Sequence, residues 1–251
     1  RDIVKQKAAR VCKGELQGEN KSLRAQTLHL RIVDDYAVIS LDAAGGLLHK
    51  RGWRAHQGKA SLRENWAANL LIMAGWEANE ALLDPFCGAG TIPIEAARIA
   101  EGLPPHIDYQ FAFKDWKIES DSVANPQFES KAHRITGYDR HAPSVAMAIK
   151  NAVLADVSIS FQQMDISEAI PPSRTGLMVA NPPYGIRLGQ RVEGLYQNWG
   201  KAIKERFPHW RGIFLCPHAG LARRVHSNTK RLTEFENGGI RVGVWIWEGT
   251  P

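Results

Sequence analysis

The chain has 251 residues, enough for one large α/β domain with a small attachment, and its 44% hydrophobic and 23% charged content is ordinary for a soluble globular protein. No run reaches the roughly 18 apolar residues that a membrane helix needs. The three cysteines and nine histidines lack the spacing of a disulfide framework or a metal cluster. We therefore expect no membrane segment, no metal and a cytoplasmic location.

The net charge of +6 is placed unevenly along the chain. Residues 1–60 contain 12 Lys and Arg against 6 Asp and Glu, whereas residues 61–251 contain 20 of each kind. This distribution is typical of a basic attachment that attracts phosphate beside a neutral catalytic domain, and equally of a solvated basic surface. Because the chain begins at Arg1 rather than Met, we expect a piece of a longer protein.

The first part of the chain predicts a small α+β unit. Apolar spacing favours a helix over residues 3–12, and alternating runs over residues 28–33 and 37–42 favour a β-hairpin. After a basic segment, Ser61 and Glu64 have the spacing of a capping box at the start of a helix that reaches Met73.

From residue 81 onward, predicted strands alternate with predicted helices. The strands cover residues 81–84, 134–139, 159–164, 176–181 and 210–216, and the helices cover residues 91–100, 142–154 and 194–206. Residues 231–236 and 241–247 form a closing hairpin, and the proline-bearing, aromatic stretch 101–130 is an insertion. This order predicts a doubly wound, mostly parallel sheet with an antiparallel strand brought into its edge.

Ligands of doubly wound sheets bind beyond the carboxyl ends of the strands. In the first such loop, Gly88 and Gly90 let the backbone approach a ligand, and the helix that starts at Thr91 offers amide groups to a carboxylate. Asp84 could accept hydrogen bonds from an ammonium group, so an amino-acid moiety fits this loop. A dinucleotide-binding fold uses a similar turn, but Pro93 stands where its third glycine would be.

Two further acids follow predicted strands. Asp139 could bind both hydroxyls of a ribose, or it could cap the helix that follows. Asp165 could accept a hydrogen bond from the amine of an adenine, or it could form a turn with Ser167.

The most specific motif is Asn181-Pro-Pro-Tyr184, at the end of a predicted strand. The Asn181 side-chain oxygen and the Pro182 carbonyl offer two acceptors, which together can bind both hydrogens of an exocyclic NH₂ group. Proline fixes φ and so holds these acceptors in place, while Tyr184 offers a face on which an unpaired base can stack. A plain turn is the alternative, but it does not explain why three other strand-end sites precede the motif in order.

Taken together, these motifs resemble those of class I S-adenosylmethionine-dependent amino-methyltransferases. More narrowly, residues 48–54, 62–68, 83–97 and 181–188 resemble the THUMP-associated guanine-N2 RNA methyltransferases, above all the bacterial enzymes that act on large-subunit ribosomal RNA. The resemblance implies a Rossmann-like, seven-stranded, mostly parallel sheet with a C-terminal antiparallel hairpin in residues 55–251. It also implies that residues 1–54 are the α+β remnant of a THUMP RNA-binding domain.

The resemblance further implies the cofactor S-adenosylmethionine and the product N2-methylguanosine in 23S ribosomal RNA, or alternatively in transfer RNA. The residues implied for the cofactor are Asp84, Pro85, Phe86, Cys87, Gly88, Gly90, Thr91, Asp139, Arg140, Asp165, Ile166 and Asn181, completed by Ser61 and Leu62. Those implied for the guanine are Asn181, Pro182 and Tyr184, and those for other parts of the RNA are Lys50, Arg51, Arg54 and Arg187. Further basic residues that could line an RNA path are Arg191, Arg223, Arg224, Lys230 and Arg231.

Other functions remain open from the residues themselves. Cys216 follows a strand and could be the nucleophile of a carbon-directed RNA methyltransferase, although such enzymes lack the Pro-Pro-Tyr motif. Protein-glutamine and DNA-adenine methyltransferases also use Asn-Pro-Pro-Tyr, and an inactive RNA-binding module could retain the fold. The basic N-terminal segment favours RNA over DNA and protein, and the oligomeric state stays open.

Overall fold

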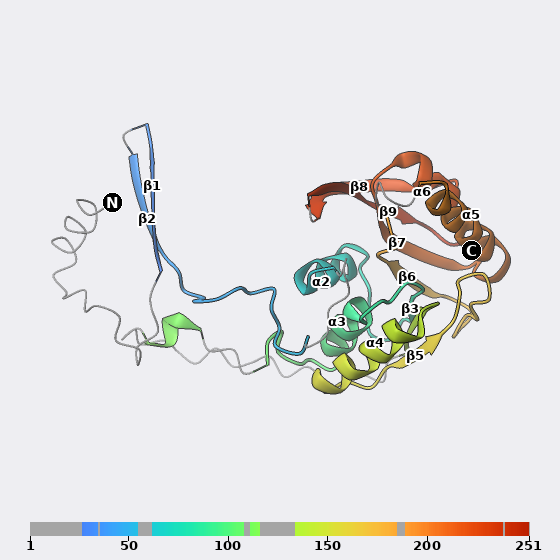
Figure 1. The fold of residues 1–251 in the computed structure, drawn as a ribbon, viewed down its shortest axis with the longest axis horizontal. Helices are drawn as coiled ribbons and strands as arrows, with labels where there is room; N and C mark the ends of the chain where they lie inside the picture. Colours follow the sequence, from blue (N-terminus) through green and yellow to red (C-terminus); the bar gives the residue numbers. More distant parts are fainter. Residues whose placement is uncertain are drawn as a thin grey trace. The chain divides into compact units, whose positions relative to one another are not determined.

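The computed structural model describes residues 27–34, 36–54, 62–107, 111–115, 134–184, 189–237 and 239–250. The helix expected over residues 3–12, the cofactor residue Ser61, the RNA residue Arg187 and much of the expected insertion lie outside them. The chain divides into two units, residues 1–47 with 110–121, and residues 48–109 with 122–251 (Figure 1). Each unit is described by itself.

The smaller unit contains the predicted hairpin. Strands β1 (Leu28–Val33) and β2 (Tyr36–Leu41) pair antiparallel. Asp34 adopts the left-handed backbone conformation in the turn between them, with φ of +48°, which Asp tolerates better than most side chains. A short 3₁₀ helix, Ala112–Asp115, joins this unit through backbone hydrogen bonds to Ala43 and Ala44.

The division between the units precedes the boundary expected after Arg54. Trp53 is fully buried and packs in one cluster with Ile94, Ala152 and Ala155 of the larger unit. Residues 48–54 are therefore part of the larger unit. That residues 1–47 derive from an RNA-binding domain stays a prediction.

The larger unit contains a seven-stranded sheet with the order β5-β4-β3-β6-β7-β9-β8 (Figure 1). Its parallel strands are β3 (Leu82–Asp84), β4 (Ile135–Asp139), β5 (Ser160–Gln163), β6 (Gly176–Ala180) and β7 (Trp210–Cys216). The strands β8 (Lys230–Asn237) and β9 (Ile240–Trp247) form the closing hairpin, and β9 pairs antiparallel with β7. The predicted Rossmann-like, mostly parallel sheet is confirmed.

Helices cover both faces of this sheet, as its strands require. They are α2 (Glu64–Met73), α3 (Thr91–Ala100), α4 (Ala142–Leu154), α5 (Gly189–Arg206) and α6 (Ala219–Val225). Successive strand residues point to opposite faces, so Leu82 packs with α2 and α3 while Leu83 packs with α5 and α6. Burial on both faces explains why the central parallel strands β3, β6 and β7 read as continuous apolar runs, whereas β5 at the sheet edge is mostly exposed.

Two local predictions are corrected. Helix α2 begins at Glu64 with Arg63 at its N-cap and no side-chain capping bond, so the predicted capping box is wrong. Glu64 is instead buried and forms an ion pair with Arg54, a partner outside the helix. Helix α6 was not predicted, and α5 starts earlier than its predicted start at Gly194.

The described residues contain neither a candidate membrane span nor a candidate metal-binding group. None of the described helices has the length and apolar content to cross a bilayer. Within the same residues, His, Cys, Asp and Glu side chains do not gather into a metal-binding group.

Candidate functional site

The predicted site residues follow four neighbouring parallel strands of the larger unit. Asp84 and Asp139 are the last residues of β3 and β4, Asp165 lies just beyond β5, and Asn181 directly follows β6. These strands are adjacent in the order β5-β4-β3-β6 and all run parallel. Their carboxyl ends therefore meet at one edge of the sheet (Figure 1), which brings the four predicted residues to the same edge.

The loop after β3 is fastened to β4 by its own backbone. The Phe86 N–H donates to Asp84 Oδ1 over 3.0 Å, and the Cys87 N–H donates to the Tyr138 carbonyl over 2.8 Å. The Gly88 N–H donates to Asp139 Oδ2 over 3.0 Å. Asp139 thus holds the shape of the glycine loop as well as lying at the end of its own strand.

Both glycines of this loop adopt conformations that other residues rarely adopt. The φ angles are +54° at Gly88 and +84° at Gly90. A Cβ at Gly90 would also lie only 3.0 Å from the Ala148 Cβ and 3.1 Å from the Phe161 ring. The sequence predicted flexible glycines for ligand approach, and the structure adds that α4 and β5 pack closely behind Gly90.

Asn151, a residue that the sequence analysis did not single out, supports the same loop. It lies on α4, is fully buried, and donates from Nδ2 to the Ala89 carbonyl over 2.9 Å. A polar residue on the apolar face of the predicted helix was the signal that could have identified it. Its partner, a carbonyl in a loop 62 residues earlier, was not visible in the sequence.

Asp84 is a buried acid with a raised pKa. Asp84 is 1% exposed, and this burial raises its pKa well above the ordinary value. The hydrogen bond from the Phe86 N–H lowers the pKa again, and the charge of Asp139 raises it further. A cation bound beside Asp84 would favour its ionised form. That Asp84 binds the ammonium group of an amino acid stays a prediction.

Cys87 lies in the same loop and is not a nucleophile. Burial raises the pKa of the Cys87 thiol well above its ordinary value, and the nearby Asp84 and Asp139 add to this. The thiol stays protonated at neutral pH.

Asp139 is not the N-cap of α4. That position is His141, which makes no capping bond with its side chain, and the His141 N–H donates to Asp139 Oδ1 over 2.9 Å. The neighbouring Arg140 is exposed. The capping alternative for Asp139 is therefore wrong, while its role toward a ribose stays a prediction.

Asp165 forms the turn that the sequence analysis gave as its alternative role. Its Oδ1 accepts from the Ser167 N–H over 3.0 Å and from the Ser167 hydroxyl over 2.8 Å. Ile166 is buried in the core cluster, so its side chain does not face a ligand. The adenine contact would therefore involve the second oxygen of Asp165 and the backbone at Ile166.

The Asn181 side-chain oxygen is one of eight buried side-chain atoms of the described residues that have no hydrogen-bond partner. The Oδ1 atom is buried and accepts no hydrogen bond from any residue that the structure describes. Buried polar atoms are almost always paired, so an unpaired acceptor at a ligand-binding edge points to a ligand donor. Next to it, Pro182 is buried and Tyr184 is partly buried against the core.

Arg54 connects the start of α3 to the segment before α2. Its Nη2 donates to the Leu62 carbonyl over 2.8 Å and to the Thr91 hydroxyl, and its Nε lies 3.3 Å from Glu64 Oε1. The Arg54 side chain is only 6% exposed. It therefore positions two predicted cofactor residues, Leu62 and Thr91.

This placement argues against the RNA contacts expected of Arg51 and Arg54. Arg51 is partly buried, with its Nε 3.4 Å from Glu95 Oε1, whereas Lys50 is exposed. Burial raises the pKa of Glu95 to about 7, and Arg51 opposes that shift. The positive charge of this segment thus serves buried ion pairs more than a phosphate surface.

Replacing Arg54 with Met is expected to weaken S-adenosylmethionine binding about five- to tenfold, since two hydrogen bonds that position Leu62 and Thr91 are lost. Titration calorimetry measures this change. The melting temperature should also fall, because Glu64 is left buried without its cation. The double variant Arg54→Met, Glu64→Met separates the two effects. It should recover stability but not affinity, and recovery of both would reduce Arg54 to a purely structural role.

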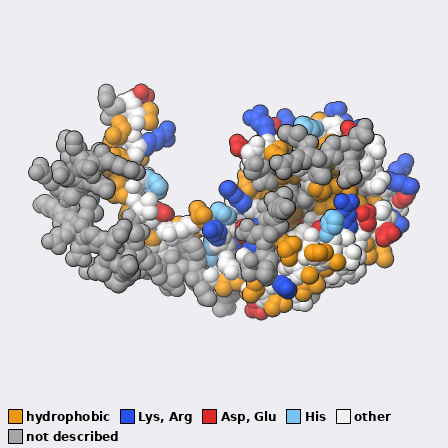
Figure 2. Space-filling view, in the orientation of Figure 1, with side chains coloured by type: hydrophobic (Ala, Val, Ile, Leu, Met, Phe, Trp, Pro, Cys, Tyr) orange, Lys and Arg blue, Asp and Glu red, His pale blue; other side chains and the backbone are white. Residues whose placement is uncertain are grey.

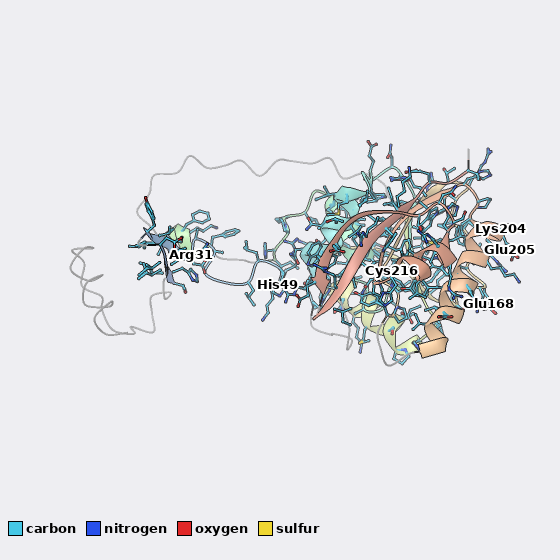
Figure 3. All side chains as sticks on the ribbon, turned by 90° about the horizontal axis from the view of Figure 1, so that it is seen from above. Arg31, His49, Glu168, Lys204, Glu205 and Cys216 are labelled. Atoms are coloured by element: carbon cyan, nitrogen blue, oxygen red, sulfur yellow. The ribbon has the colours of Figure 1, made fainter. Side chains whose placement is uncertain are left out.

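Cys216, the alternative nucleophile, ends β7 inside the larger unit (Figure 3). It is fully buried, its Sγ donates to the His218 carbonyl over 3.3 Å, and burial raises the pKa of the Cys216 thiol. A buried, protonated thiol is a poor nucleophile, which argues against methyl transfer to a ring carbon.

The fold and the site together define a class I methyltransferase. They combine a doubly wound sheet, the glycine loop after β3, the acids at the ends of β4 and β5, and the Asn-Pro-Pro-Tyr motif after β6. Residues 51–243 match the family described as the RMKL-like methyltransferase domain, and the chain belongs to that family. S-adenosylmethionine is accordingly its cofactor.

Several relatives and solved structures are similar to this chain. The ribosomal RNA large subunit methyltransferase K/L of Shewanella frigidimarina is 34% identical over 226 residues, which cover 83% of this chain and 32% of that protein. SMU.472, crystallised as a complex with SAH, has a TM-score of 0.81 at 25% identity, over 98% of this chain and 67% of the other. A predicted N6-adenine-specific DNA methylase of Listeria monocytogenes has a TM-score of 0.80 at 28% identity, over 99% of this chain and 68% of the other. The chain spans about a third of the length of the first of these relatives.

Proposed function

We propose that this chain transfers a methyl group from S-adenosylmethionine to the exocyclic N2 amine of guanine in RNA, with large-subunit ribosomal RNA as the substrate. The observation that carries the proposal is the buried, unpartnered Oδ1 of Asn181. It lies after β6, beside β3, whose loop carries most of the predicted cofactor residues. The name of the Shewanella relative supports ribosomal RNA as the substrate.

In this proposal each acid at the sheet edge recognises one part of the cofactor. Asp84 accepts from the ammonium group, which offsets the cost of its burial. Asp139 accepts from the ribose hydroxyls while it keeps Gly88 in place, and Asp165 accepts from the adenine amine. The amides at the start of α3 face the carboxylate.

S-adenosylmethionine supplies an electrophilic methyl group on a sulfonium. Asn181 Oδ1 and the Pro182 carbonyl each accept a hydrogen bond from one of the two N–H groups of the guanine amine. This arrangement points the nitrogen lone pair away from the two acceptors. As the new N–C bond forms and the S–C bond breaks, positive charge develops on the nitrogen, and the two acceptors stabilise it. Water takes the proton, so no dedicated base and no covalent intermediate are required.

The main competing acceptors are adenine in DNA and a glutamine side chain, because both present an NH₂ group to the same motif. The Listeria structural neighbour is named for the first of them. RNA is favoured by the large-subunit rRNA methyltransferase named above and by the basic N-terminal segment. That this segment is a remnant of a THUMP domain remains part of the proposal.

A side-by-side assay tests the acceptor class. We expect radiolabelled methyl groups to enter in vitro transcribed large-subunit ribosomal RNA, with little label in double-stranded DNA or in release factor protein. Preferential labelling of DNA or release factor would overturn the RNA assignment. If the chain were an inactive RNA-binding module, titration calorimetry would detect no binding of S-adenosylmethionine.

A further inference from the structure

The larger unit contains a cavity beside the proposed guanine site, most of whose lining residues have no role in the proposed function. Its volume is about 720 Å³, within the range of about 300–1,000 Å³ that small-molecule sites occupy. Tyr184 forms one wall, the segment Pro217–His218 after β7 forms another, and residues of α5, α6 and the tip of the β8–β9 hairpin complete it. The cavity therefore begins at the last residue of the Asn-Pro-Pro-Tyr motif.

The strand order places this cavity on the acceptor side of the sheet. The residues proposed for the cofactor follow β3, β4 and β5, which lie on one side of β6. The cavity is bounded by segments that follow β6 and β7 and by the β8–β9 tip, on the other side. An acceptor amine held after β6 must reach the methyl donor from that other side, so the rest of the acceptor extends toward the cavity.

The lining combines apolar walls with cations at the opening. Val192, Leu221 and Ile240 are apolar, and Arg224 and Arg241 are the arginines of the lining. The Arg241 side chain is 81% exposed, and its Nε lies 3.4 Å from Glu234 Oε1. Such a combination suits a nucleoside with a phosphate at its edge.

The acid in the lining is Glu193, and its Oε2 lies 3.1 Å from Arg224 Nη2. This pair is partly exposed and offsets its own charge. Arg241 shares Glu234 with Arg231, whose Nη1 lies 3.1 Å from Glu234 Oε2, so that cluster keeps a net positive charge for a phosphate. On the visible face in Figure 2, Lys and Arg side chains are scattered over the larger unit and do not form one patch.

We propose that this cavity holds the nucleotide adjacent to the methylated guanine in the same RNA strand, with Tyr184 as the wall next to the target amine and Arg241 at the intervening phosphate. The inference rests on the proposed function, because it takes Asn181 and Pro182 as the binding site of the target amine. It adds a recognition site for sequence context beside the reactive base.

Gly220 allows the cavity to be filled without disturbing the fold. It lines the cavity on α6, its φ is ordinary for an L-residue, and a Cβ there would meet no atom within 4 Å. Gly220→Phe should lower kcat/KM for in vitro transcribed large-subunit ribosomal RNA by about tenfold or more, as expected when a stacked base is displaced. The dissociation constant for S-adenosylmethionine and the melting temperature should stay unchanged.

The matched control is Gly194→Phe. Gly194 lies on α5, is not among the lining residues, and a Cβ there also meets no atom within 4 Å. This variant should methylate RNA at the unmodified rate. Equal activity of the two variants would overturn the proposed nucleotide site, as would a selective loss of release factor methylation in Gly220→Phe.

Arg241→Ala tests the phosphate contact independently. It should raise KM for the RNA and reduce the slope of log affinity against log salt by about one, as the loss of one phosphate contact predicts. An unchanged slope would contradict the contact. If Asn181→Ala abolishes methylation while Gly220→Phe and Arg241→Ala do not change it, this inference fails and the proposed function stands. If Asn181→Ala leaves methylation unchanged, the proposed function itself fails.

Discussion

Asn181→Ala is expected to lower the turnover of RNA methylation by about 10²- to 10³-fold, the loss typical of removing one preorganised group that stabilises transition-state charge. The alanine variant lacks the acceptor that holds one N–H bond of the amine and that faces the charge forming on nitrogen. Since Oδ1 accepts no hydrogen bond from any described residue, its removal breaks none of the contacts seen in the fold. Single-turnover kinetics with saturating cofactor measure the effect.

Cofactor affinity separates this role from a general disturbance of the site. The dissociation constant for S-adenosylmethionine should change less than twofold in Asn181→Ala, because the proposed acceptor contact forms with the RNA. Asn181→Asp, which keeps a side-chain oxygen at this position, should retain more turnover than the alanine variant. Similar losses of turnover and of cofactor affinity would contradict the role assigned to Asn181.

The second large effect is expected for Asp139→Ala, which should weaken S-adenosylmethionine binding by about 10- to 100-fold. Two contributions combine. The variant loses the proposed contact with the ribose hydroxyls, and it removes the partner of the Gly88 N–H that keeps the glycine loop in shape. The ribose contact is a hydrogen bond to a charged group, worth about 1.5–3 kcal/mol, which by itself corresponds to this range; the Gly88 contact acts on the cofactor only through the shape of the loop. Turnover at saturating cofactor should fall far less than affinity.

Titration calorimetry checks the prediction for Asp139. Glu168→Ala is the matched control, since Glu168 is an exposed acid at the periphery of the same unit (Figure 3), close in sequence to Asp165. Its cofactor affinity should equal that of the unmodified chain. A dissociation constant unchanged by Asp139→Ala would exclude Asp139 from the cofactor site.

Periodicity predicted the larger sheet because its central parallel strands, such as β6 and β7, are buried on both faces and therefore form apolar runs. It also predicted the closing hairpin, whose two strands flank a glycine turn. Helix α6 escaped prediction because it has only seven residues, two of them basic, and buries two side chains, Ala222 and Val225. The capping box at Ser61 failed because Glu64 pairs with Arg54, a contact that local sequence cannot reveal.

The candidate site was more predictable than the contacts that support it. Asp84, Asp139, Asp165 and Asn181 could be identified because each stands at a strand end, and strand ends of a parallel sheet share one edge. The ion pairs of Arg51 and Arg54, which argue against their expected RNA contacts, could not be predicted. Their acidic partners lie elsewhere in the sequence, so their burial became visible only in three dimensions. The cavity beside Tyr184 is likewise assembled from segments that only the fold brings together.

The identity of the methylated nucleoside tests the central claim most directly. After incubation with large-subunit ribosomal RNA and isotopically labelled S-adenosylmethionine, the RNA is digested and its nucleosides are separated by liquid chromatography with mass spectrometry. If Asn181 and Pro182 bind the guanine amine, the label appears in N2-methylguanosine. The Asn181→Ala variant, assayed in the same way, should give no label. Label in a ring-carbon-methylated pyrimidine or in a ribose-methylated nucleoside would contradict the account.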